Sequence, residues 1–121
     1  MFLKRLKRRR HKRFEVCWDA LLEVRFPEFQ NQMSVIVVNF SIAGALLNSE
    51  QIYVDGHHLF VTDKRPEMSL KMFSPEGILN AAIHVQWYRW LEEQNIFEVG
   101  IKFVDILKEN QELVYKVIDN L

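Results

Sequence analysis

The amino-terminal segment, residues 1–13, concentrates positive charge. It contains eight of the 16 Lys and Arg residues of this 121-residue chain and none of its 16 Asp and Glu residues. The segment therefore carries a net charge of +8 and the other 108 residues carry −8, although the whole chain is neutral. A basic segment beside an acidic body indicates an anionic partner, which could be a nucleic acid, a membrane surface or a phosphorylated ligand.

A second polar segment, residues 39–44, reads Asn-Phe-Ser-Ile-Ala-Gly and lies between two apolar runs. Such residues are common at turns, because Gly tolerates positive φ and short polar side chains bond to the local backbone. We interpret residues 39–43 as a break between two strands.

The remaining polar groups have no spacing typical of catalysis or metal binding. His57 and His58 are adjacent in an expected turn, and the other two histidines are distant in sequence. The single cysteine, Cys17, cannot form an internal disulfide, which agrees with a reducing compartment. No zinc-binding pair, glycine-rich phosphate loop or nucleophile motif occurs. We therefore expect no enzyme activity, no metal and no cofactor.

The elements that position these residues are predicted to be strands. In residues 14–26 the even positions are apolar and several odd positions are charged, so we expect one long strand with its even face on the core. An Asp-Gly pair at residues 55–56 favours a hairpin turn between residues 52–54 and 59–61. Alternating or β-branched runs predict further strands in residues 33–38, 44–47, 68–72, 79–87 and 97–103.

Only the end of the chain has helical spacing. Leu113, Val117 and Leu121 recur with Val114 and Ile118 beside them, which predicts an amphipathic helix over about residues 107–120. Some six antiparallel strands followed by one helix predict a mainly all-β fold, a small antiparallel barrel, because closure removes exposed edges. We expect the helix to cover one opening or flank of the barrel.

The length fits one domain. We assign residues 14–121 to the barrel with its helix and residues 1–13 to a flexible basic segment. The longest aliphatic run, residues 35–38, is far shorter than the roughly 20 apolar residues of a transmembrane helix. The opening residues lack the apolar stretch of a secretory signal. We expect a cytoplasmic protein.

Taken together, the basic segment and the polar turn resemble the two-part signature of the PilZ domain family. Arg9 and Arg13 match its RxxxR half, and Asn39, Ser41 and Gly44 match its second half, written here as NxSxxG. Residues 14–16, 44–47, 85–87 and 99–105 also agree with the family in order and position. The resemblance therefore runs from about residue 8 onward.

The resemblance implies a six-stranded β-barrel with a C-terminal helix that binds cyclic di-GMP, a bacterial second messenger with two phosphates and two guanines. Arg9 and Arg13 would be the principal ligand residues, with Arg8 and Arg10 in support. The planar guanidinium suits this ligand, because it can grip phosphate or guanine with two parallel hydrogen bonds and can stack on a base.

The second half of the signature would form the opposite wall of the site. Asn39 and Ser41 could bond guanine edges or phosphate, although Asn offers guanine one acceptor where the Asp of many family members offers two. Gly44 would supply a positive φ or let the ligand approach the backbone closely. Trp87 could stack on a base or pack in the core, and strand alternation leaves both open.

Alternative functions remain open at this stage. A small barrel with a basic arm could bind single-stranded nucleic acid, although the acidic body and the scarcity of aromatic residues within the basic run argue against it. A membrane-surface module ranks lower, because Met1, Phe2, Leu3 and Leu6 would give a weak anchor. A single PilZ-like unit would signal through an unidentified downstream protein, with outputs such as motility, biofilm or exopolysaccharide control.

Overall fold

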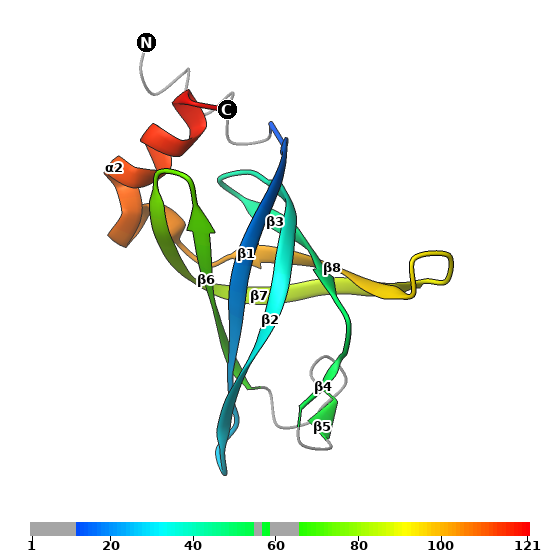
Figure 1. The fold of residues 1–121 in the computed structure, drawn as a ribbon. Coiled ribbons are helices and arrows are strands. Elements are labelled where there is room, and N and C mark those ends of the chain that lie inside the picture. Colours follow the sequence, from blue (N-terminus) through cyan, green and yellow to red (C-terminus); the bar gives the residue numbers. More distant parts are fainter. Residues whose placement is uncertain (1–11, 55–56, 59–65) are drawn as a thin grey trace.

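Six strands close into an antiparallel barrel in the computed structural model, which describes residues 12–54, 57–58 and 66–121 (Figure 1). Around the barrel the strand order is β1-β2-β3-β8-β7-β6, and every neighbouring pair is antiparallel. The strands are β1 (Phe14–Arg25), β2 (Gln30–Phe40), β3 (Gly44–Ser49), β6 (Glu67–Ser74), β7 (Gly77–Leu91) and β8 (Ile96–Phe103). The predicted mainly β, six-stranded barrel is confirmed.

Strand alternation builds the core as the sequence predicts. In β1 the side chains of Trp18, Ala20, Leu22 and Val24 are buried, and the odd positions between them face outward or are half-buried. The same alternation in the other strands sends one face of each into the barrel. Because successive strand side chains point to opposite faces, each barrel strand also presents an outer face on which polar residues can gather.

A small separate sheet pairs β4 (Tyr53–Val54) with β5 (His57–His58). The expected hairpin is present, because Tyr53 and Val54 pair with His58 and His57. The prediction that the two histidines belong to the turn is wrong, since they form the second strand of the hairpin. The Asp-Gly pair and residues 59–61, expected to continue that strand, lie outside the described residues. Tyr53 contacts His58 with ring centroids 5.0 Å apart.

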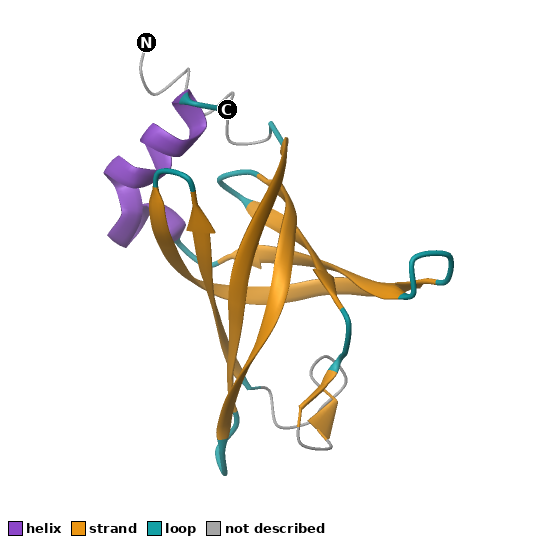
Figure 2. Ribbon diagram, viewed as in Figure 1, coloured by secondary structure: helices purple, strands orange, loops and turns teal. Residues whose placement is uncertain are grey.

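The C-terminal helix α2 (Ile106–Asp119) begins and ends one residue earlier than expected. Asp105 caps it, since its carboxylate accepts a hydrogen bond from the Lys108 backbone N–H at 3.1 Å. The apolar face buries Ile106, Val114, Val117 and Ile118, whereas Leu121 lies beyond the helix and is 46% exposed. Figure 2 shows the helix beside the β6–β7 turn at one end of the barrel.

Asn110 fastens α2 to the barrel. Its backbone departs from helical geometry, and its amide donates a 2.7 Å hydrogen bond to the Asn80 carbonyl of β7. This hydrogen bond attaches the helix to β7.

Candidate ligand-binding site

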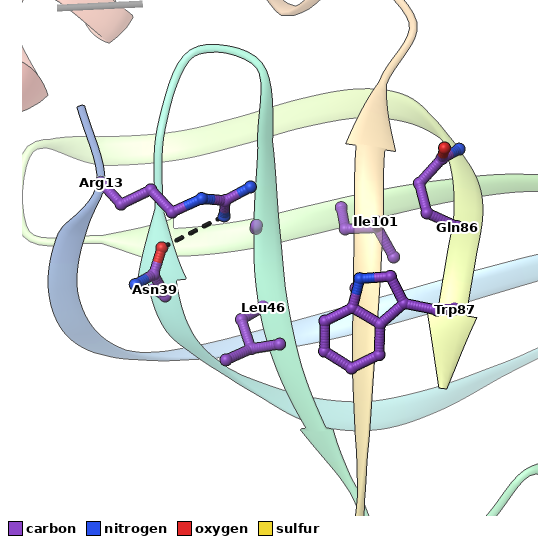
Figure 3. A pocket seen from close by; sticks show the side chains of 8 residues that line it. Arg13, Asn39, Leu46, Gln86, Trp87 and Ile101 are labelled. Atoms are coloured by element: carbon purple, nitrogen blue, oxygen red, sulfur yellow. Dashed lines mark hydrogen bonds between the residues drawn. The ribbon is translucent and has the colours of Figure 1, made fainter. Parts of the chain in front are cut away.

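Arg13 and Asn39 come together because β1 and β2 pair along their whole length. Phe14 lies opposite Phe40 and Glu15 lies opposite Asn39, so the residue before β1 reaches the end of β2. The Arg13 guanidinium donates to the Asn39 side-chain oxygen at 3.3 Å (Figure 3). The expected break at residues 39–43 is wrong at its start, because β2 continues to Phe40 and pairing with β1 holds Asn39 in strand geometry.

Trp87 lies on the outer face of the barrel and is 46% exposed, which excludes core packing. Plain alternation from Leu79, Ala81 and Ile83 would turn residue 87 inward. A β-bulge between Val85 and Trp87 adds one residue to β7 relative to β8, and this reverses the alternation.

The Trp87 indole packs directly over Gly100, which we call its platform. Trp87 lies opposite Gly100 in the β7–β8 register. A Cβ at residue 100 would lie 2.5 Å from the indole Nε1 and 2.8 Å from Cζ2, so only glycine leaves room for the ring in this position. Sequence reasoning missed Gly100 as a site residue, because its position opposite Trp87 depends on the register between β7 and β8.

The outer faces of β2, β3, β7 and β8 enclose a pocket of about 300 Å³ beside these residues. Figure 3 shows Arg13 and Asn39 at one side of it and Trp87 with Gln86 at the other. The side chains of Leu46 and Ile101 form an apolar surface of the pocket between these two sides. The lining residues include one cationic side chain, Arg13, and no carboxylate, so the pocket favours an anionic or hydrogen-bonding ligand with a flat apolar part.

Ser41 shapes the turn between β2 and β3. It is 2% exposed, and its hydroxyl accepts hydrogen bonds from the Ala43 and Gly44 backbone N–H groups, each at 3.2 Å. The same hydroxyl lies 3.2 Å from the Gly44 carbonyl, to which it donates. A direct bond from this hydroxyl to a ligand would compete with these turn bonds.

Gly44 opens β3 and lies opposite Lys102 of β8. Its expected positive φ is wrong: among the described glycines only Gly77 has one. A Cβ on Gly44 would instead overlap the Ile101 carbonyl oxygen and lie 3.2 Å from the carbonyl carbon. The close approach that requires glycine here is therefore between two strands of the barrel.

The other predicted residues, Arg8, Arg9 and Arg10, lie outside the described residues, so their place in the site stays a prediction. Within the described ranges, no group of three or more His, Cys, Asp and Glu side chains could hold a metal ion. No helix in the described part of the chain is both long and apolar enough to cross a bilayer.

A family model described as the PilZ domain matches residues 7–119. A search of curated proteins found no match. The structure is similar to MrkH, described as a c-di-GMP-dependent transcription regulatory factor, with a TM-score of 0.60 and 12% identity over 89% of this chain. This chain covers 48% of the MrkH chain, or about half its length.

The structure is also similar to the PilZ domain of YcgR from Escherichia coli with c-di-GMP. The TM-score is 0.54 and the identity 8%, with 93% of each chain covered. At such identities the two likenesses concern the fold alone.

Proposed function

Because this chain belongs to the PilZ domain family, we propose that it is a non-enzymatic receptor for cyclic di-GMP. The family match covers both halves of the RxxxR and NxSxxG signature. Both similar structures are described with reference to c-di-GMP, which supports the choice of ligand.

The observation that carries this proposal is the placement of Arg13, Asn39 and Trp87 around one pocket. The Arg13 side chain is exposed and uses one N–H group to donate to Asn39. Its other N–H groups can donate hydrogen bonds to a phosphate or a guanine edge. The exposed indole of Trp87 offers a guanine a stacking surface. A ligand with both phosphates and purine rings satisfies both ends of the pocket.

Asn39 has two roles in the proposed site. Its oxygen already accepts from Arg13, which orients the guanidinium, and its amide N–H₂ can donate to a guanine acceptor. Ser41 and Gly44 act through the backbone: the turn bonds of Ser41 and the close packing of Gly44 hold β2 and β3 in place. We keep both as site residues by motif, with positioning as their proposed contribution.

Arg9 completes the proposed site by motif, and Arg8 and Arg10 supply supporting positive charge. Arg13 is the last residue of the basic segment, and its side chain lines the pocket. The segment of +8 can therefore compensate the phosphates of a compact dianion, or of a stacked dimer of it. The net charge of −8 on the rest of the chain disfavours a long nucleic acid.

The downstream step is proposed to be relay to a partner protein in the cytoplasm. Ligand binding at Arg13 and Trp87 would change the surface of the barrel around the pocket, and another protein could recognise that change. Outputs such as motility, biofilm or exopolysaccharide control fit a receptor of this family.

Calorimetric titration with cyclic di-GMP tests the proposal, with GTP and a single-stranded oligonucleotide as competing ligands. Arg13→Ala is expected to weaken binding by about tenfold or more, because a charge-assisted hydrogen bond contributes about 1.5–3 kcal/mol. Arg25→Ala is the matched control, since Arg25 is the last residue of β1, the strand that Arg13 precedes, and has an exposed ion pair at 3.8 Å with Glu67. Absence of heat with cyclic di-GMP would refute the function, and heat with the oligonucleotide alone would favour nucleic-acid binding.

A further inference from the structure

Arg89 and Glu98 form an ion pair across β7 and β8, beside the Trp87 indole. The Arg89 Nε and Nη2 atoms both lie 2.6 Å from the same oxygen of the Glu98 carboxylate. In the part of the β7–β8 register that follows the bulge, Trp87 lies opposite Gly100 and Arg89 lies opposite Glu98. Because alternate residues of a strand point to the same face, Arg89 shares the outer face of β7 with Trp87.

The Arg89 guanidinium contacts the Trp87 ring, with its central carbon 5.7 Å from the ring centroid. A guanidinium at this distance is attracted to the indole by a cation–π interaction. The residues that line the pocket include Trp87 and Gly100 but not Arg89. Arg89 is therefore placed to act on a ligand in the pocket through the indole.

Glu98 fixes the position of the Arg89 guanidinium. The Glu98 side chain is 13% exposed, whereas that of Arg89 is 65% exposed, so the carboxylate is the better packed member of the pair. Two N–H groups that donate to one carboxylate restrict the orientation of the guanidinium. The two strands are also held together by Trp90 and Phe97, whose ring centroids lie 4.7 Å apart. The guanidinium is thus held at a defined place beside the indole.

Stability of the fold does not account for this arrangement. An ion pair with a largely exposed member usually contributes little to the free energy of folding. An exposed indole such as that of Trp87 has other rotamers open to it, and holding it in one of them costs conformational entropy. The contact with Arg89 favours the rotamer in which the ring lies over Gly100.

We propose that Arg89 and Glu98 are a positioning pair that holds the Trp87 indole over Gly100, where a base of the ligand can stack on it. The ligand part of this inference rests on the proposed function, and the part that concerns the indole does not. Apparent affinity falls in proportion to the fraction of the protein that is in the binding-competent arrangement. An exposed cation–π contact shifts such an equilibrium by about two- to fivefold, so loss of Arg89 should weaken binding by that factor.

The orientation of the indole can be measured by NMR without a ligand. The Gly100 Hα proton that takes the place of a Cβ points into the Trp87 ring, so the ring current displaces its chemical shift. Trp87→Ala gives the shift in the absence of the ring. We expect Arg89→Ala to move the shift toward that value, and Arg89→Lys, which keeps the cation, to stay closer to the parent. Glu98→Ala should move it in the same direction, and adding Glu98→Ala to Arg89→Ala should change it no further, because Glu98 acts through Arg89.

Calorimetric titration with cyclic di-GMP and urea denaturation complete the test. Arg89→Ala should bind about two- to fivefold more weakly than the parent, with an unchanged urea midpoint. Arg25→Ala is the matched control, because it removes the same charge from an Arg–Glu pair of neighbouring strands, in which Arg25 lies opposite Glu67. This control should keep the parent's Gly100 shift and the parent's affinity.

Three results would each overturn the proposal: a parent-like Gly100 shift in Arg89→Ala, an equal change of that shift in Arg25→Ala, or parent-like affinity in Arg89→Ala although the shift has moved. If the parent itself gives no heat with cyclic di-GMP, the proposed function fails, and the ligand part of this inference fails with it. The Gly100 shift then still decides whether Arg89 and Glu98 position the indole.

Discussion

Replacing Gly100 by Ala gives the sharpest test of how the pocket is built. The added methyl group would overlap the Trp87 indole, with contacts of 2.5 Å to Nε1 and 2.8 Å to Cζ2. Carbon atoms pack favourably at about 3.5–4.0 Å, so the ring must move by roughly 1 Å or swing away from the platform. Gly100→Ala should therefore remove the stacking surface without touching a residue that carries charge.

The expected effect on binding follows from the value of stacking. A base stacked on an aromatic side chain contributes about 1–3 kcal/mol, which corresponds to a loss of about 5- to 150-fold in affinity for cyclic di-GMP. The fold should tolerate the change. Trp87 is 46% exposed and can move toward solvent, and Ala recovers about 0.5–1 kcal/mol of the cost of glycine in a strand. We expect the free energy of unfolding to stay within about 1 kcal/mol of the parent value.

The assay is calorimetric titration of the parent, Gly100→Ala, Trp87→Ala and the double variant, with urea denaturation of each. Since both substitutions remove the same surface, the double variant should bind within about twofold of Trp87→Ala alone. Parent-like affinity in Gly100→Ala would refute the platform role. Fully additive losses would show that Gly100 acts on the ligand by a route that does not involve Trp87.

Three further substitutions separate binding from stability. Asn39→Asp should tighten cyclic di-GMP binding severalfold, because a carboxylate can accept from two guanine N–H groups; weaker binding in the same titration would contradict this. Ser41→Ala should lower the free energy of unfolding by about 1–3 kcal/mol in urea denaturation, because it leaves turn N–H groups in a part-buried or buried setting without their acceptor. Gly44→Ala should cost more than Gly100→Ala in the same measurement, since the Ile101 backbone cannot move aside as an exposed indole can; equal stability of the two variants would contradict this.

Much of the fold could be predicted from the sequence because local periodicity reports it directly. The alternation in residues 14–26 is a property of one strand, and the structure has β1 at Phe14–Arg25 with the predicted even face inward. The helix bounds differed by one residue at each end, as expected where end residues depend on capping. His57 and His58 were expected in a turn of residues 55–58, but they pair with Val54 and Tyr53, so the connection between the paired strands is shorter than expected.

The sequence by itself determined the strand periods, the single helix, the charge division and the residues of the two-part motif. Only the tertiary structure decided which face Trp87 occupies, because the β7 bulge arises from a register between two strands and has no local sequence period. The contact of Arg13 with Asn39 likewise depends on β1–β2 pairing across 26 positions of sequence. The need for glycine at Gly44 and Gly100 comes from atoms of neighbouring strands, Ile101 and Trp87, which no local pattern can place.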